Sequence, residues 1–163
     1  WHMARIRLRD IRATPWPATA HVPAVPDGSG GTRPATIGDV YASERALALL
    51  LRWHIRIPVD VASGVHAGAR LVNALNHAAI PASAGNPTTW TDAHQALLVQ
   101  GIMDEVAAIN NANLTDTMTY VNTWPSWAGG SNPRRFALAE TIGTLATTRT
   151  FQFDDSDLPP APY

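Results

Sequence analysis

The chain has 163 residues and a formal net charge of −1, so it can form one domain with a core and has no overall charge to steer it to nucleic acid or membranes. It contains neither Cys nor Lys, which excludes disulfides, thiolate metal ligands, Lys Schiff bases and a Walker-type phosphate loop. Charged residues make up only 15%, against a usual share of about 25%, and this favours a chain that buries much of its exterior against partners.

The sequence opens with Trp1-His2-Met3, and two alternatives stay open for this start. Either two residues precede a native Met3, or the chain is a piece of something longer. No apolar run approaches the roughly 20 residues that a membrane-spanning helix needs. The compartment stays unknown, with a virion or a cytoplasmic assembly as the expectation.

Residues 4–12 alternate between apolar and basic side chains, and this period of two predicts a short basic strand or arm. Several Arg on one face can release counterions from nucleic acid, which makes this segment a candidate for contact with nucleic acid or a partner. The alternative is an edge strand whose basic side chains face water or a partner's carboxylates. The candidate residues are Arg5, Arg7, Arg9 and Arg12.

Residues 13–35 contain five Pro and three Gly, which predicts an extended linker with a flexible joint. Trp16 stands between two prolines and needs an apolar pocket in this chain or in another, so it is a candidate for partner contact. Residues 1–35 are therefore interpreted as a basic extended arm and linker.

A helix is predicted from Thr36, with Asp39 in a capping-box position, towards Trp53. Residues 52–61 then alternate strictly between polar and apolar side chains, which indicates an extended connector between helices. Pro58 would keep such a strand at the edge of a sheet.

The next predicted helix spans roughly 63–79, with Val65, Val72, Leu75 and Ala79 on its buried face. A polar stripe follows the opposite face, and it consists of His66, Arg70, Asn73 and His77. The two His lie some 16 Å apart along the axis, too far to bind one metal ion. The stripe could line a cleft, follow a phosphate backbone, face solvent or form a subunit interface.

The longest predicted helix runs from about Thr91 to Asn110, and two shorter ones follow over 115–123 and from Asn132 to about 147. Within the longest helix, His94 with Asp104 and Glu105 is a weaker candidate group. Trp127, in a loop, is a further candidate for partner contact.

Residues 148–163 are predicted to form an acidic, proline-rich arm that begins with an extended piece over 149–153. Its acidic residues could pair with the basic arm of another copy. The candidate partner contacts are Asp154, Asp155 and Asp157.

These elements predict a mainly α fold, in which about five helices pack as one irregular bundle over 36–147, with short extended segments and an extended arm at each end. No catalytic, metal or cofactor motif stands out, so no cofactor is expected.

The leading hypothesis is a non-enzymatic structural subunit of a larger assembly, such as a capsid-like shell or a virion component built by interlocking arms. Its partners would be other copies or other subunits, and nucleic acid through the Arg arm. One alternative is a small helical enzyme or ligand-binding protein that uses the polar stripe, and another is an accessory subunit of a multi-protein complex.

Overall fold

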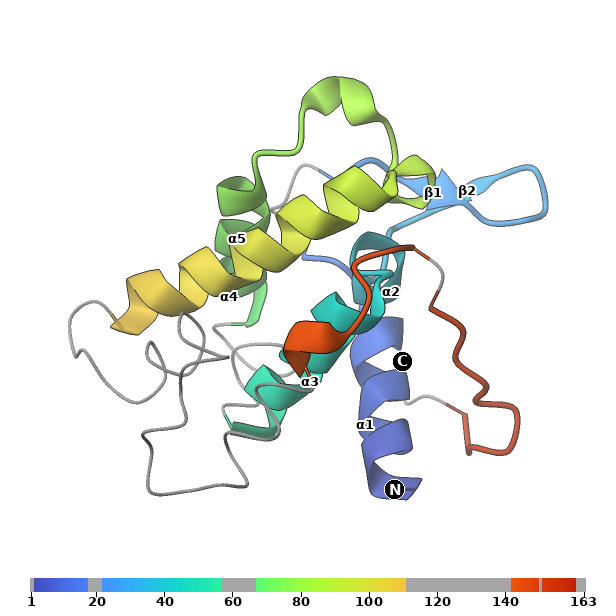
Figure 1. Ribbon diagram of the computed structural model, residues 1–163. Coiled ribbons are helices and arrows are strands. Elements are labelled where there is room, and N and C mark those ends of the chain that lie inside the picture. Colours follow the sequence, from blue (N-terminus) through green and yellow to red (C-terminus); the bar gives the residue numbers. More distant parts are fainter. Residues whose placement is uncertain (1, 18–21, 57–66, 111–141, 150, 161–163) are drawn as a thin grey trace.

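The computed structural model describes residues 2–17, 22–56, 67–110, 142–149 and 151–160 (Figure 1). Several predicted features lie outside these residues: the connector beyond residue 56, the helix over 115–123, most of the helix over 132–147, His66 and Trp127.

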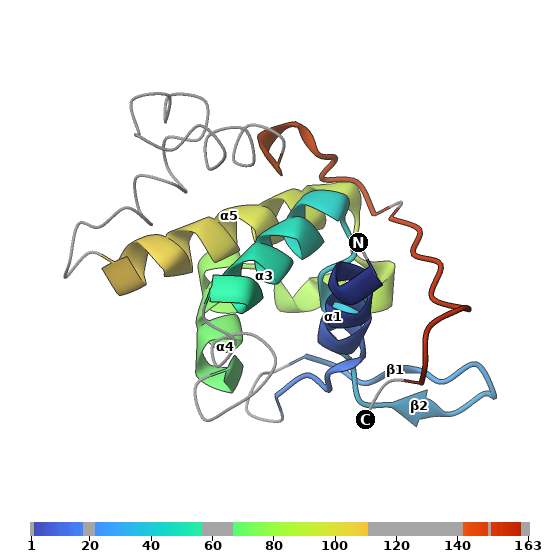
Figure 2. The same ribbon diagram turned by 90° about the horizontal axis from the view of Figure 1, so that it is seen from below.

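The described chain is mainly α-helical, as the sequence predicts. Its long helices are α1 (His2–Ala13), α3 (Glu44–Arg56), α4 (Ala67–Ala78) and α5 (Asp92–Asn110). A short α2 (Ile37–Val40) and two 3₁₀ turns, η2 (Ala82–Ala84) and η3 (Pro87–Thr89), join them. Helix α3 contacts both α1 and α5, and α4 crosses and packs against α5 (Figure 2). None of the described helices combines the length and the apolar character needed to cross a bilayer.

Residues 2–13 form helix α1, so the prediction of a basic strand within an extended arm is wrong here. Leu8 and Ile11 are three residues apart and pack into the core, with Ile11 fully buried. The same spacing places Arg5, Arg9 and Arg12 on one side of the helix. The pattern of these nine residues is compatible with the period of a strand or with that of a helix. Packing of this segment against α2 and α3 favours the helix.

Residues 52–56 are the last turn of α3, so the extended connector is also wrong over these residues. Ala46, Leu50 and Trp53 are all buried and follow the helical spacing i, i+4, i+7. Helix α3 therefore continues through residues 52–56, because Trp53 extends the buried face that Ala46 and Leu50 begin.

The predicted helix from Thr36 begins as expected but is interrupted. The Thr36 side chain accepts from the Asp39 N–H, and the Asp39 carboxylate accepts from the Thr36 N–H, which confirms the capping box. Tyr41 then takes an extended conformation, and α3 starts afresh with the Ser43 hydroxyl accepting from the Ala46 N–H. Neither Pro nor Gly marks this break in the sequence.

A hairpin replaces part of the predicted linker. Strand β1 (Val25–Pro26) pairs antiparallel with β2 (Thr32–Arg33), and the hairpin projects from one side of the helices (Figure 1). The Asp27 carboxylate accepts hydrogen bonds from Ser29 and from the Gly31 N–H inside the turn. Two glycines of the turn, Gly28 and Gly30, have positive φ values of 84° and 94°. Residues with a side chain rarely adopt this backbone conformation.

Helices α4 and α5 cross closely at Gly101. A Cβ atom at this position would lie 2.1 Å from the Ala74 carbonyl oxygen and 2.8 Å from the Ala78 nitrogen. Both alanines are buried, whereas the predicted face of α4 is only half-buried at Val72 and exposed at Ala79. The helix is therefore rotated by about one residue from the prediction, because small side chains allow the closer approach.

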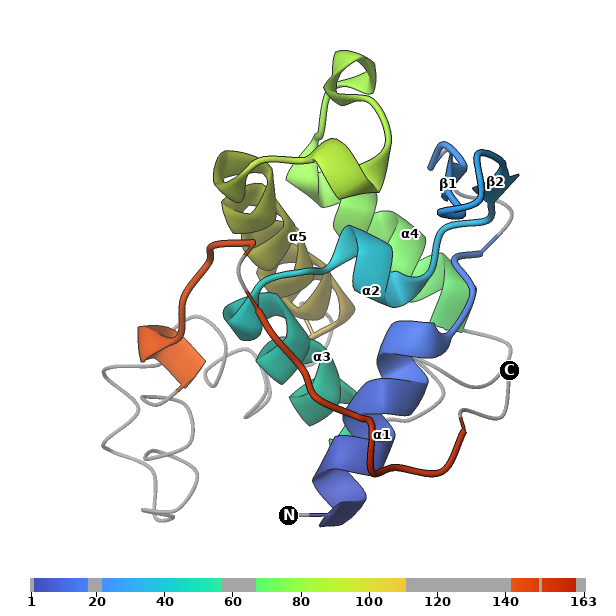
Figure 3. The same ribbon diagram turned by 90° about the vertical axis from the view of Figure 1, so that its right-hand side faces the viewer.

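The C-terminal segment, residues 151–160, has no helix or strand and runs alongside α1 (Figure 3). The basic helix and the acidic segment thus lie together within one chain.

Candidate functional site

Glu105 is a carboxylate on the buried face of α5. It follows Leu98 and Ile102 by seven and three residues, so it continues the apolar stripe of the helix. Only 2% of the residue is exposed. A carboxylate in such a position needs polar partners, because burying an unpaired charge is costly.

Helix α4 supplies these partners from three positions at i, i+3 and i+7. Arg70 Nη1 lies 3.1 Å from Glu105 Oε1, and Asn73 Nδ2 donates to the same oxygen at 3.2 Å. His77 Nε2 lies 3.3 Å from the other oxygen, Oε2. Both carboxylate oxygens are therefore engaged by α4.

The cluster opens to one side. A hollow of about 430 Å³ is lined by the four residues of the cluster together with Asn76 and Ala108. The side chains of Arg70 and His77 are 37% and 41% exposed, whereas that of Glu105 is 3% exposed. The donors thus reach the hollow while the carboxylate stays behind them.

This arrangement can perform acid–base chemistry. When a neutral imidazole donates from Nε2 to a carboxylate, its Nδ1 carries the lone pair that accepts a proton. The carboxylate of Glu105 can hold the His77 ring in this tautomer and stabilise the imidazolium that forms.

Three residues of the predicted polar stripe come together in this cluster, whereas the fourth, His66, lies outside the described residues. The predicted grouping of His94, Asp104 and Glu105 is wrong. His94 accepts from the Thr91 N–H at the start of α5, and Asp104 accepts from Gln100. The prediction did not identify Glu105 as the residue that the polar stripe of α4 contacts. The signal that could have identified it is a carboxylate within the apolar stripe of α5.

Arg7 does not share a face with the other arginines of α1, in contrast to the prediction. Arg5 donates to both carboxylate oxygens of Asp157 at 2.9 and 2.6 Å, and also to the Asp154 carbonyl. The hydrogen bond from Arg5 holds the pKa of the Asp157 carboxyl below its usual value. The pairing of basic and acidic ends, which was predicted between copies, is thus found here within one chain.

The other arginines of α1 have separate environments. Arg9 is buried and pairs with Asp10, whereas Arg7 is exposed on the far side of the helix. The Arg12 guanidinium lies over the rings of two Phe residues, 151 and 153, and burial lowers its pKa.

Trp16 is 7% exposed and packs against Tyr41, with ring centroids 6.0 Å apart. Its pocket therefore lies in its own chain.

Asp155 and Asp157 are exposed on the C-terminal segment.

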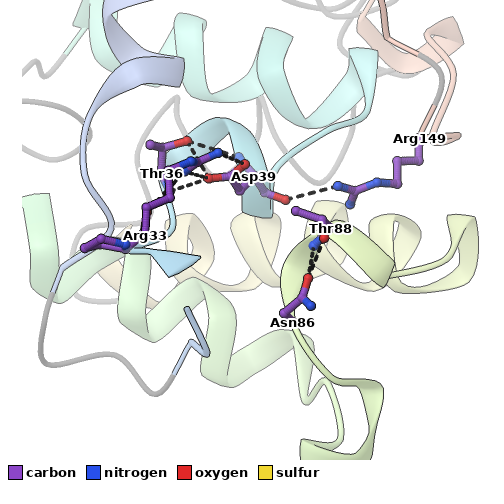
Figure 4. A network of polar contacts seen from close by, with 7 residues as sticks. Arg33, Thr36, Asp39, Asn86, Thr88 and Arg149 are labelled. Atoms are coloured by element: carbon purple, nitrogen blue, oxygen red, sulfur yellow. Dashed lines mark hydrogen bonds and ion pairs between the residues drawn. The ribbon is translucent and has the colours of Figure 1, made fainter. Parts of the chain in front are cut away.

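A second polar network is centred on Asp39 (Figure 4). Arg33 donates to both Asp39 oxygens at 2.7 and 2.9 Å, in addition to the capping box with Thr36. Arg149 donates to the backbone carbonyls of Asp39 and Pro87. Burial raises the pKa of the Asp39 carboxyl, but the bonds from Arg33 and Thr36 outweigh it, so its pKa lies below the usual value. Through Arg33 and Arg149, this network joins the hairpin, α2, η3 and the segment that contains Arg149.

Both networks border a hollow. Arg33 and Asp39 line a hollow of about 480 Å³ beside α1, and the Glu105 cluster lines the hollow described above. Arg33 also donates to the Asp39 carboxylate, and Arg149 donates to backbone carbonyls. Within the described residues, no group of three His, Asp or Glu is placed to hold a metal ion. Comparisons of the chain with family models, with curated proteins and with solved structures gave no match.

Proposed function

We propose that this protein binds a small polar ligand in the hollow beside Glu105 and exchanges a proton with it through His77. The observation that carries the proposal is the convergence of three α4 side chains on both oxygens of one buried carboxylate at the wall of a hollow. Such a convergence of polar groups in a concave place is typical of ligand sites.

Each residue has a distinct role in this proposal. A guanidinium has five N–H donors, and only Nη1 of Arg70 is used on Glu105, so the others can bind a ligand oxygen. His77 exchanges the proton, Glu105 positions the His77 ring and the Arg70 guanidinium, and Asn73 helps to hold Glu105 in place. The ligand class is therefore a small molecule with an anionic or carbonyl oxygen next to an exchangeable proton.

The test is a ligand-observed NMR screen with a library of small carboxylates and amides. We expect members that bind the wild-type chain to lose binding in Arg70→Gln and in His77→Gln. His94→Gln is the matched control, because His94 lies on α5 away from the hollow and should leave binding unchanged. Binding that is indifferent to both α4 variants, or a library without any binder, would overturn the proposal.

A second candidate is the structural subunit of an assembly, at its most specific a capsid-like shell or a virion component. The contact between Arg5 and Asp157 supports it, because exchange of α1 or of the C-terminal segment between copies would make the same ion pair across an interface. The exposed Met3 and Arg7 on α1 would then face another subunit or nucleic acid. An accessory subunit of a multi-protein complex would use the same surfaces.

Light scattering coupled to size-exclusion chromatography tests this second candidate. An assembly held by exchanged ends should be large, sensitive to salt and lost in Asp157→Arg, but restored when Arg5→Glu is combined with it. A monomer at every concentration would contradict the candidate, and it would leave the ligand proposal standing.

A further inference from the structure

The geometry points to a second binding site, which we infer takes the phosphate group of a small phosphorylated molecule. The site is a hollow of about 480 Å³ between α1, the start of α2 and the C-terminal segment. It is separate from the hollow beside Glu105 and does not depend on the function proposed for that hollow. Three arginines line it, and they are Arg9, Arg12 and Arg33.

Arg9 is the first reason to expect an anion. The residue is only 8% exposed, and its Nε and Nη2 both donate to Asp10. Its Nη1 is buried and has no hydrogen-bond partner within the described part of the chain. A buried charged donor without an acceptor is destabilising, and a bound oxyanion would supply the acceptor.

Arg12 is the second reason. Its Nε is also buried without a hydrogen-bond partner among the described residues. Its guanidinium lies 5.7 and 5.4 Å from the ring centroids of Phe151 and Phe153, and within the described residues no hydrogen bond joins it to a carboxylate. The charge of Arg12 is held in place by two rings without direct neutralisation, which leaves its donors for a ligand.

Among the lining arginines, Arg12 is the one without a carboxylate partner within the described residues. Arg33 pairs with Asp39 and Arg9 pairs with Asp10, and the lining includes one further carboxylate, that of Asp155. Asp39 is already engaged by Arg33 through two hydrogen bonds. The Asp155 carboxylate would repel a bound anion. Removal of its charge should therefore strengthen anion binding, whereas removal of an arginine should weaken it.

The size and shape indicate which anion fits. Planar guanidinium groups bind phosphate oxygens through paired hydrogen bonds. The volume is within the range of small-molecule sites, roughly 300–1,000 Å³, and exceeds what a bare phosphate fills. Leu158, Pro159 and Pro160 add an apolar wall for the rest of the molecule.

The experiment is a calorimetric titration of the full chain with phenyl phosphate and, separately, with inorganic phosphate. Phenyl phosphate should bind more tightly than inorganic phosphate. Arg12→Gln should weaken binding by about tenfold, the loss expected for one hydrogen bond to a charged group. Asp155→Asn should tighten it.

Arg7→Gln is the matched control, since Arg7 lies on the same helix but is exposed and outside the lining. It removes the same charge and should leave both titrations unchanged. Circular dichroism of each variant reports whether it is folded, and Asp155→Asn keeps the test valid if Arg12→Gln does not fold.

Three results would overturn the inference. The first is the absence of binding for both probes at millimolar concentration. The second is an equal loss in Arg7→Gln and Arg12→Gln, which would mean a diffuse charge effect. The third is binding of a single-stranded oligonucleotide that depends on Arg7 while phenyl phosphate does not compete, which would assign the basic residues to nucleic acid.

Discussion

Gln95 is a fully buried amide that holds together the break between α2 and α3. Its Oε1 accepts from the N–H groups of Ala42 and Ser43, and its Nε2 donates to the Val40 carbonyl. The side chain therefore replaces the helical hydrogen bonds that the backbone loses at this break.

Gln95→Leu keeps most of the volume but leaves three backbone groups without this partner. Because each buried unpaired group costs about 1–3 kcal/mol, we expect the free energy of unfolding to fall by about 3 kcal/mol or more. Urea denaturation measures this change. Gln100→Leu, on the exposed side of the same helix, should stay within about 0.5 kcal/mol of wild type. An equally small effect at Gln95 would contradict the bridging role.

Gly101 sets two effects of opposite sign against each other. Alanine is favoured over glycine in a helix by about 1 kcal/mol, but the added Cβ would collide with the Ala74 carbonyl at 2.1 Å. We expect the collision to prevail and Gly101→Ala to destabilise the chain by about 1–3 kcal/mol in urea denaturation. Ala96→Gly, at an exposed position of α5, measures the propensity effect alone. A stabilised Gly101→Ala would show that α4 and α5 can separate at no cost.

At the scale of the element, the capping box of α2 predicts a dependence on pH. The pKa of Asp39 is lowered in the folded chain, so its ionised form stabilises the fold above its unfolded pKa of about 3.9. This contribution is lost as the pH falls from about 4 through the folded pKa. We expect Asp39→Asn to be less stable by about 1 kcal/mol at pH 7, with the difference from wild type shrinking below about pH 4.

Urea denaturation of both proteins between neutral and acidic pH measures this difference. Asp92→Asn is a suitable control, because it removes another carboxylate at the start of a helix without removing the capping box. A difference between Asp39→Asn and wild type that stays constant into acid would mean that the Asp39 charge plays no part.

The elements also show where periodicity suffices as a guide. Helices α4 and α5 were predictable because each repeats the 3.6 period over more than three turns. Helix α1 and the end of α3 were predicted as extended, because alternation over a few residues fits both periods. Only the buried Ile11 and Trp53 show which period the core selects.

At the scale of the whole molecule, Arg5 and Asp157 join two segments that are 152 positions apart in the chain. Asp157→Arg should release the C-terminal segment from α1, and the double variant Arg5→Glu with Asp157→Arg should restore the contact. Limited proteolysis within residues 151–160 measures the release, which should accelerate cleavage in the single variant alone. Arg7→Glu is the control, and accelerated cleavage there would mean that general charge, not this pair, holds the segment.

The sequence by itself determined the mainly α class, the capping box at Thr36, helices α4 and α5, and three members of the polar stripe on α4. These features depend on side chains within a few residues of one another, so caps and periodicity express them directly. Tertiary structure decided the rest. It decided that α1 is a helix, that the polar stripe of α4 binds Glu105 of α5, and that the charged ends meet within one chain. Such contacts depend on which buried faces pack together, and spacing along the sequence does not contain that information.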